Sequence, residues 1–220
     1  LVVSVFSVDM PKEQLNRVAD LIYKNEASGK KENLIVWNNG EDFLSLGIGH
    51  FIWYPEEHSE IFRESFPELQ EFLVLRGYIL PSFLNNIHAP WKDKNDFIAA
   101  KATPEFQAAL DFLHDTRYVQ MELITMRAEK ALDAILTKTK RPEEVKKAFY
   151  EVFNSPFGAY PIIDYVNFKG EGTKESEVYN GQGWGLLQVL EHMIDNKKEI
   201  SPVEKFIEGG KFVLQRRVDN

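Results

Sequence analysis

Apolar residues recur at helical spacing over most of the chain and at strand-like spacing in one short stretch. Leu15, Val18 and Ile22 are three or four residues apart, which predicts one face of a helix that begins near Pro11. Residues 34–54 are rich in strand formers and are interrupted by an Asn-Asn-Gly turn sequence. This stretch predicts a small antiparallel sheet, and we expect no other sheet in the chain.

The remainder of the chain predicts mainly helices. Helical patterns occupy residues 67–76, 104–114, 118–136, 142–153 and 186–195, and a capping-box sequence at 201–204 begins a last helix. A glycine-rich segment at 168–185 is interpreted as a loop. The predicted fold class is therefore α+β, with a single domain over residues 1–220. Its small β lobe covers about 30–56 and its mainly helical lobe about 60–220.

Composition and charge exclude several classes of function. With 44% hydrophobic and 27% charged residues, the chain can form a core. The net charge of −8 argues against a general nucleic-acid binder, because phosphate backbones require clustered cations. The absence of cysteine excludes disulfide scaffolds and thiolate metal sites, and no histidine pair has metal-ligand spacing, so we expect neither a metal nor another cofactor. No apolar run reaches the ~18–20 residues of a membrane span.

Glu26 interrupts the apolar face of the first predicted helix. It comes four residues after Ile22, where another aliphatic residue is expected, and just before the helix-ending Ser28-Gly29. A carboxylate held against apolar neighbours loses hydration and tends to stay protonated near neutral pH. Such a group can donate a proton to a leaving oxygen. The alternative is a frayed helix end with Glu26 in water.

The sequence Ser-Leu-Gly-Ile-Gly-His at residues 45–50 follows Glu26 in the predicted hairpin. This order of helix, glutamate, turn and hairpin resembles the lysozyme-like superfamily of glycosidases. Phage-type lysozymes place a catalytic glutamate near the end of their first helix and a Thr/Ser-x-Gly-Ile-Gly-His strand after it. The resemblance implies a lysozyme-like fold, with Glu26 as general acid and Ser45 positioning water or the N-substituent of the substrate. Alternatively, Ser45 is only a hydroxyl of an edge strand.

A second resemblance extends from about residue 13 to about residue 189. The segments that carry it are 25–29, 42–55, 164–172 and 181–188. They are similar to a proteobacterial family that contains the deacetylation-specific lysozyme of predatory bacteria. The resemblance implies a glycosidase that cleaves β-1,4 bonds of peptidoglycan and prefers N-deacetylated glycan strands. Because this substrate lies outside the cytoplasmic membrane, we expect an exported chain, periplasmic or secreted, whose leader has been removed. We also expect the protein to be a monomer.

The second catalytic carboxylate of the phage-type pattern is missing. It lies six residues before the Ser/Thr of the strand, where this chain has Asn39. Glu41 and Asp42 are nearby, and Asp42 is taken as the candidate. A lytic transglycosylase needs no carboxylate to activate water, so this activity with Glu26 alone remains an alternative. A non-catalytic wall-binding or inhibitory module on the same fold is a third.

Further residues are predicted to bind the glycan. Gly47 and Gly49 would let a sugar approach the strand closely, and His50 beside them is predicted to bind substrate, with a packed, hydrogen-bonded histidine favoured over a catalytic one. The remaining candidates are the aromatic residues Trp53, Tyr54 and Trp184 as stacking platforms, with core positions as the alternative, and Glu171 and Gln182 as partners of sugar hydroxyls. The acidic residues Glu41, Asp42, Glu56, Glu57 and Glu171 would favour a glycan whose amines are protonated.

Overall fold

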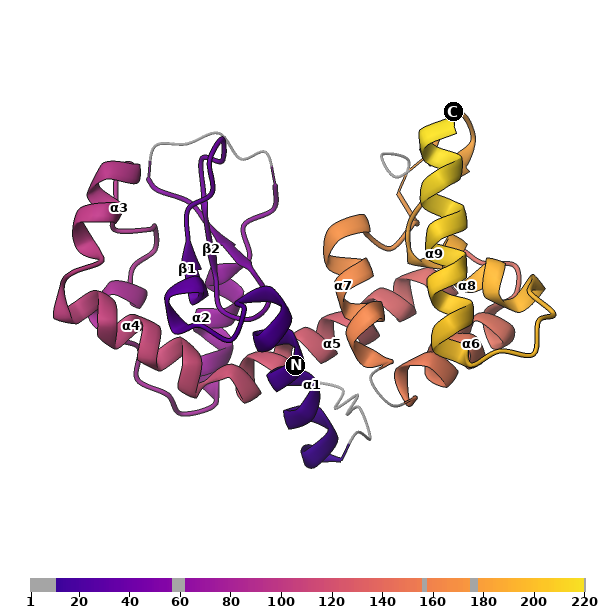
Figure 1. Ribbon diagram of the computed structural model, residues 1–220, viewed down its shortest axis with the longest axis horizontal. Coiled ribbons are helices and arrows are strands. Elements are labelled where there is room, and N and C mark those ends of the chain that lie inside the picture. Colours follow the sequence, from indigo (N-terminus) through magenta and orange to yellow (C-terminus); the bar gives the residue numbers. More distant parts are fainter. Residues whose placement is uncertain (1–10, 57–61, 156–157, 175–177, 220) are drawn as a thin grey trace. The chain divides into compact units, whose positions relative to one another are not determined.

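A computed structural model of the chain describes residues 11–56, 62–155, 158–174 and 178–219. Over these residues the fold is α+β, with nine α-helices, a three-stranded antiparallel sheet and a two-stranded one (Figure 1). The chain divides into two compact units, which we call the N-terminal unit (Pro11–Leu123) and the C-terminal unit (Ile124–Asn220). The extended start predicted for the chain lies outside the described residues. Within the described part, no helix has the length and apolar character to cross a membrane.

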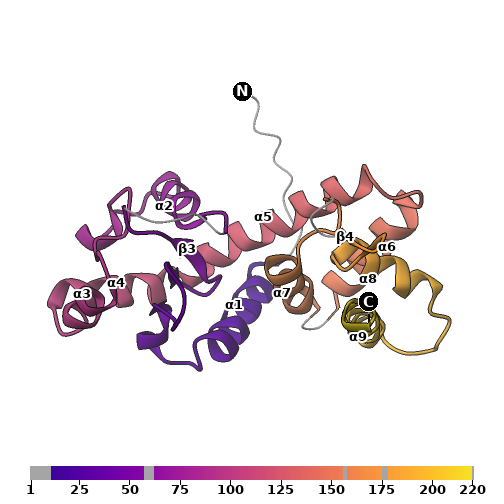
Figure 2. The same ribbon diagram turned by 90° about the horizontal axis from the view of Figure 1, so that it is seen from above.

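The N-terminal unit combines a sheet with short helices. Its elements are α1 (Lys12–Glu26), the 3-10 turn η1 (Lys31–Leu34), β1 (Ile35–Val36), β2 (Leu44–Leu46), β3 (Phe51–Trp53), α2 (Phe66–Leu75), the 3-10 turn η2 (Ser82–Leu84), α3 (Lys94–Ala100), α4 (Pro104–Asp115) and the first turns of α5 (Arg117–Leu136). Helix α2 packs on β3, as Figure 2 shows, and α4 packs on η1 and η2.

The three-stranded sheet has one face with no exposed surface and one face that is only partly buried, which we call the open face. The strand order is β1-β2-β3, so β2 is central, and Ser45 pairs with Val36 on one side and Ile52 on the other. Successive side chains of a strand point to opposite faces. The buried face is formed by side chains with no exposed surface: Ile35, Leu44, Leu46, Phe51 and Trp53. Ser45 therefore lies on the opposite face, where Val36 and Ile52 are half-buried.

The C-terminal unit is almost entirely helical. After the rest of α5 it contains α6 (Pro142–Phe153), α7 (Ala159–Lys169), β4 (Val178–Tyr179), β5 (Gln182–Gly183), α8 (Leu186–Asp195) and α9 (Pro202–Asp219). Helix α8 packs against α6, α7 and α9. Its core includes Phe149 and Phe153, whose stacked rings have centroids 5.3 Å apart, and Val189 and Leu190 of α8.

Helices with clear end signals were predicted well. α6 and α8 have the predicted bounds, and the Thr103 hydroxyl caps α4 by accepting a hydrogen bond from the Phe106 amide at 3.2 Å. The capping box of α9 is also confirmed: the Ser201 amide donates to Glu204 Oε2 at 2.9 Å, and the Glu204 amide donates to Ser201 Oγ at 3.2 Å.

Two helices and one hairpin were missed. Helix α3 has only seven residues, too few for a periodic pattern, although the Asp93 carboxylate caps it. Helix α7 is rich in β-branched and aromatic residues of low helix propensity, and burial of Ile162 and Ile163 compensates. The expectation of a single sheet is wrong, because β4 and β5 form a second hairpin within the glycine-rich segment. Its turn residues Asn180 and Gly181 have φ of 48° and 75°, as an Asn-Gly hairpin turn requires.

Candidate functional site

Helix α1 ends at Glu26, and a tight turn then leads the chain toward the sheet. The side chain of Glu26 lies outside the described part of the structure. Ser28 and Gly29 follow with φ of 52° and 65°, and the Gly29 amide donates to the Tyr23 carbonyl at 3.2 Å. The Asn33 side-chain amide donates to the Ala27 carbonyl at 3.1 Å. The backbone on the C-terminal side of Glu26 is thereby fixed.

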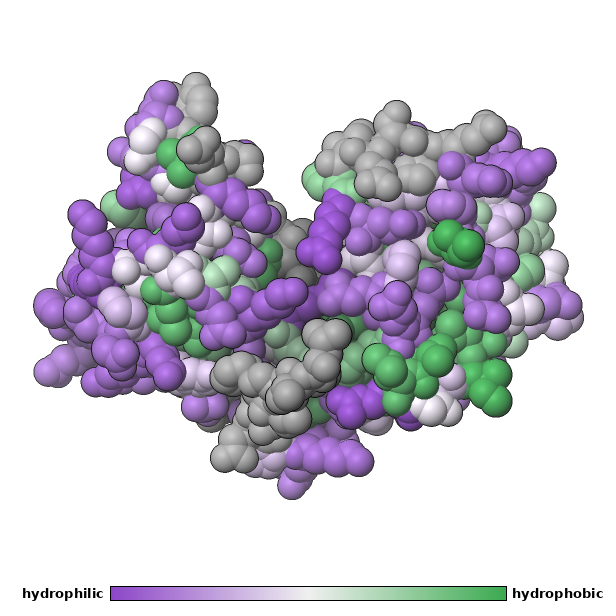
Figure 3. Space-filling view, turned by 180° about the vertical axis from the view of Figure 1, so that it is seen from behind, coloured by the Kyte–Doolittle hydropathy of each residue, from purple (hydrophilic) through white to green (hydrophobic). Residues whose placement is uncertain are grey.

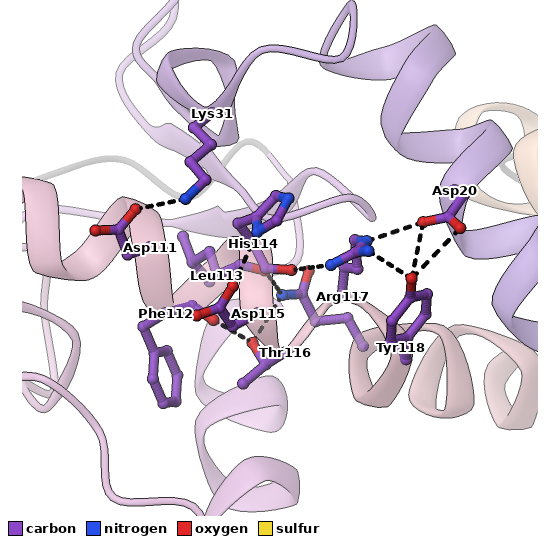
Figure 4. A network of polar contacts seen from close by, with 11 residues as sticks. Asp20, Lys31, Asp111, Phe112, Leu113, His114, Asp115, Thr116, Arg117 and Tyr118 are labelled. Carbon is purple, nitrogen blue, oxygen red and sulfur yellow. Dashed lines mark hydrogen bonds and ion pairs between the residues drawn. The ribbon is translucent and has the colours of Figure 1, made fainter.

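A polar network fastens α1 to the start of α5 (Figure 4). The Asp20 carboxylate accepts hydrogen bonds from Arg117 Nε at 2.9 Å and from the Tyr118 hydroxyl at 3.2 Å. Arg117 also donates to that hydroxyl and to the His114 carbonyl, and its guanidinium lies 4.1 Å from the centre of the Tyr118 ring. The guanidinium is largely buried, with 16% of the side chain exposed. The network sets the position of the last two turns of α1.

Two further contacts connect the surroundings of Glu26 to α4. The ring of Tyr23 meets His114 edge-on at 5.4 Å, and His114 contacts Asp115, which lowers the pKa of the Asp115 carboxyl. After the turn, Lys31 Nζ donates to Asp111 at 2.7 Å, and this bond raises the pKa of Lys31. Glu26 is therefore flanked on both sides by segments that α4 and α5 hold in place.

Ser45 lies in the central strand of the sheet, so the alternative of an edge-strand hydroxyl is wrong. Its hydrogen-bonded neighbours are Val36 and Ile52, and 7% of the residue is exposed. That exposed surface belongs to the open face of the sheet, because Leu44 and Leu46 of the same strand point into the core. Ser45 keeps its place among the candidate residues.

The hairpin turn after Ser45 is fastened by a residue that the sequence did not indicate. Gln120 of α5 is fully buried, and its Oε1 accepts a hydrogen bond from the Ile48 amide at 2.9 Å. Its Nε2 donates to the Leu113 carbonyl at 2.6 Å and to Thr116 Oγ1 at 3.1 Å. Every polar group of this amide is thus engaged, and the turn is bound to the junction of α4 and α5.

Gln120 also explains the glycine at 47, and this explanation corrects the predicted role of Gly47. Gly47 has a φ of +67°, and a β-carbon at this position would lie 2.3 Å from Gln120 Oε1. The protein's own amide fills the space that had been assigned to a sugar. Gly49 and His50 are half-buried, and His50 adopts a left-handed φ of 46°. Their predicted contact with substrate stays a prediction.

The predicted stacking platforms Trp53 and Tyr54 are core residues. Neither has any exposed surface. Trp53 donates to the Ile87 carbonyl at 3.2 Å and its ring lies 4.6 Å from that of Phe66, while Tyr54 lies 5.5 Å from Phe43. Because no ring face is open to a ligand, we remove both residues from the candidate site.

The turn between β1 and β2 borders an open depression of about 680 Å³. We call it the β1–β2 depression; residues 37–42, Pro55 and residues 92–94 line it. It contains Asn39, Glu41 and Asp42, the three positions considered for a second carboxylate. Lys94 contacts the Asn39 side chain, the Glu41 carboxylate accepts from Asn38 at 2.9 Å, and Asp42 is exposed. Among the residues that the structure describes, the Asp42 carboxylate has no partner, whereas Asn39 and Glu41 are held by neighbours.

The other predicted binding residues belong to the C-terminal unit. Glu171 accepts from the Thr173 hydroxyl at 3.1 Å, and Gln182 is exposed on β5. Trp184 is half-buried, and the Arg217 guanidinium lies 4.2 Å from the centre of its ring. One face of Trp184 is therefore occupied by the protein. Of the predicted acidic cluster, Glu56 is exposed, and Glu57 lies outside the described residues.

Two glycines of this unit, Gly172 and Gly183, are explained in the same way as Gly47. The Gln188 side chain accepts from the Gly185 amide at 2.9 Å and donates to the Gly172 carbonyl at 3.2 Å. A β-carbon at Gly172 would lie 2.2 Å from Gln188 Oε1, and one at Gly183 would lie 2.7 Å from Gln188 Cδ. The backbone of the glycine-rich segment thus packs around the Gln188 side chain, which extends from the first turn of α8.

In the part of the chain that is described, no group of three or more His, Asp or Glu side chains could hold a metal ion. Comparisons of the chain with protein-family models, with curated proteins and with solved structures gave no match. The function therefore has to be argued from the residues themselves.

Proposed function

We propose that this chain is a lysozyme-like glycosidase that cleaves β-1,4 bonds of peptidoglycan, with Glu26 as general acid. The observation that carries the proposal is the order of elements in the N-terminal unit. A helix ends at Glu26, a fastened turn follows, and the next hairpin presents Ser45 on its open face just before the Gly-Ile-Gly-His turn. Anchored backbone on both sides of a catalytic group favours catalysis, because a positioned acid needs no reorganisation during the reaction.

The chemistry assigns one role to each group. Glu26 donates a proton to the leaving glycosidic oxygen, which needs a carboxyl that stays protonated; the C-terminal end of a helix favours this, because its free carbonyls carry partial negative charge. Ser45 holds water or the N-substituent of the sugar, and Asp42 of the β1–β2 turn is the candidate for a second carboxylate. An inverting glycosidase would use such a carboxylate to activate water.

A lytic transglycosylase is the second candidate, and the environment of Asn39 favours it. The position expected to hold the second carboxylate has a neutral amide, contacted by Lys94. A transglycosylase uses the same glutamate as acid and then as base, and the sugar's own hydroxyl replaces water. The two reactions therefore differ in their products.

The test is digestion of purified sacculi by the full chain and by Glu26→Gln. We expect the substitution to lower release of soluble fragments at least about a hundredfold, the usual contribution of a general acid. Glu32→Gln, on the exposed surface of η1, serves as control and should retain activity. Activity of Glu26→Gln equal to that of the parent would disprove the assignment. No release by the parent from any wall type would instead favour a wall-binding module.

Mass spectrometry of the released fragments distinguishes the two reactions. Hydrolysis gives reducing ends, and we expect these. Anhydro ends would replace the lysozyme proposal with the transglycosylase. The proposal also includes export of the chain, because peptidoglycan lies outside the cytoplasmic membrane. Detection of the full-length chain in cytoplasmic fractions alone would contradict that part.

A further inference from the structure

The β1–β2 depression contains charges of both signs that do not pair with each other. Glu41, Asp42 and Asp93 supply carboxylates, and Lys92 and Lys94 supply ammonium groups. Over the described ranges of the chain, no ion pair joins any two of these five residues. Opposite charges that border one depression without neutralising one another leave both signs available to a ligand.

Neutral groups hold three of the five charges. The Asn38 side-chain amide donates to Glu41 at 2.9 Å, Lys94 contacts the side-chain oxygen Oδ1 of Asn39, and Asp93 accepts from the backbone amides of Asn95 and Asp96 at the start of α3. Asp42 and Lys92 remain. Both side chains are exposed, and neither makes a hydrogen bond or ion pair with any residue that the structure describes.

The depression also has an apolar wall. Trp37 and Pro55 line it, and Trp37 is fixed because its indole donates to the Glu41 carbonyl at 2.7 Å while its ring packs 6.1 Å from that of Phe97. A volume of about 680 Å³ is within the range of small-ligand sites. A small group with an aliphatic part, one positive charge and one negative charge matches these walls.

We propose that the β1–β2 depression binds a zwitterionic group, with Asp42 accepting from its ammonium, Lys92 donating to its carboxylate, and Trp37 covering its aliphatic part. The chemistry is that of an amino acid or a short peptide with free termini. That the group belongs to the peptide substituents of peptidoglycan rests on the proposed function; there, the ammonium and carboxylate would be those of a diamino acid side chain, because the N-terminus of the peptide is amide-linked to the lactyl group. The site then recognises the peptide part of the wall, and in this assignment Asp42 binds the peptide's ammonium group and does not activate water for cleavage of the glycan.

The test is an NMR titration of the full chain with three related dipeptides. Ala-Ala carries both charges, N-acetyl-Ala-Ala only the carboxylate, and Ala-Ala-amide only the ammonium. We expect Ala-Ala to shift the backbone amides of residues 37–42 and 92–94, and each single-charge analogue to bind about tenfold more weakly, the effect of losing one charged hydrogen bond. Equal binding of all three peptides, or no shifts at millimolar Ala-Ala, would overturn the proposal.

Substitutions assign the two charges. Asp42→Asn should abolish the advantage of Ala-Ala over N-acetyl-Ala-Ala, and Lys92→Gln should abolish its advantage over Ala-Ala-amide. Asp96→Asn and Lys146→Gln, exposed and outside the depression, should leave the titration unchanged. A loss of binding in these controls equal to that in the test variants would mean that overall charge, and not the site, attracts the peptide.

A final comparison distinguishes this proposal from the proposed function. Glu26→Gln should bind Ala-Ala as the parent does. In this variant, wall fragments with peptides should shift the same amides, and peptide-free glycan should not. Binding of Ala-Ala by a chain that cleaves no wall would support the zwitterion site and refute the glycosidase. If peptide-free glycan shifts these amides as strongly as the peptide-bearing fragments, the depression is a sugar site and the proposal falls.

Discussion

At the scale of single residues, the contact between Gly47 and Gln120 makes a quantitative prediction. Gly47→Ala introduces both a left-handed φ for a non-glycine residue and a β-carbon 2.3 Å from Gln120 Oε1. We expect the free energy of unfolding to fall by about 2–4 kcal/mol, the combined cost of strain and overpacking. Urea unfolding of the full chain measures the loss.

Gly40 provides the matched control. Its φ is +80°, but a β-carbon there would meet nothing within 4 Å. Gly40→Ala should therefore lower the free energy of unfolding only by the strain of a left-handed φ, about 1 kcal/mol. In a Gln120→Ala background the cost of Gly47→Ala should fall to the same value, because the clashing amide is gone. If Gly47→Ala and Gly40→Ala are equally destabilising in the parent, the contact has no energetic importance.

Sequence reasoning at this scale succeeded where the signal was local. Ser28-Gly29 ends α1 as predicted, and Ser45 lies on the hairpin. It failed for Trp53 and Tyr54, because an aromatic residue in a strand has the same pattern whether it faces the core or a ligand. Gln120 could not be found in advance, because its hydrogen bond to Ile48 joins positions 72 residues apart. Only the fold brings these two residues together.

At the scale of elements, helix α7 is held against the second hairpin by Tyr165. Its hydroxyl donates to the Trp184 carbonyl at 2.8 Å, and burial raises the pKa of Tyr165 to about 12, although Arg216 and Arg217 act in the opposite direction. The raised pKa means that folding favours the neutral phenol. Its contribution to stability is complete below pH 10, the ordinary pKa of tyrosine, and is lost as the pH rises through about 12.

We therefore expect Tyr165→Phe to flatten the alkaline part of the stability curve. Between pH 9 and pH 11, about one unit on either side of the ordinary tyrosine pKa, the urea midpoint of the parent should fall more than that of the variant. Tyr78→Phe is the control, because Tyr78 is 38% exposed. The urea midpoint of this variant should depend on pH as that of the parent does. An identical fall in the parent and in Tyr165→Phe would rule out ionisation of this phenol as the cause.

Two of the helices that the sequence predicted, α4 and α9, begin with their own capping signals. Thr103 before α4 and the Ser201–Glu204 box before α9 are local hydrogen-bonding patterns, readable without tertiary structure. Helix α7 has no such cap, and its β-branched residues favour strands when considered alone. The helix forms because burial of its apolar residues outweighs their local preference.

At the scale of the whole molecule, the net charge of −8 bears on which wall the proposed glycosidase would cleave faster. Hydrophilic side chains cover most of the face shown in Figure 3, with exposed apolar residues in small groups. Ordinary peptidoglycan is polyanionic and repels such a protein, whereas N-deacetylation adds amines that can be protonated. We expect faster release from deacetylated sacculi than from the same sacculi after chemical re-acetylation.

The salt dependence of that preference identifies its cause. If long-range attraction is responsible, the ratio of the two rates should decrease as salt rises to about 0.1 M and beyond, where the screening length falls to ~10 Å. A ratio that does not depend on salt would assign the preference to direct contacts in the site. Equal rates on both walls at low ionic strength would show that the acidic surface has no part in selecting the substrate.

The two turns in which a glutamine side chain occupies the space beside a glycine also restrict the order in which this sequence can change during evolution. At Gly47 and at Gly172, the volume of a β-carbon is already taken by an amide from a helix that lies elsewhere in the chain. A mutation of either glycine should therefore cost less stability after the glutamine has become a smaller residue than before that change. Gly47 with Gln120, and Gly172 with Gln188, should therefore be inherited as pairs.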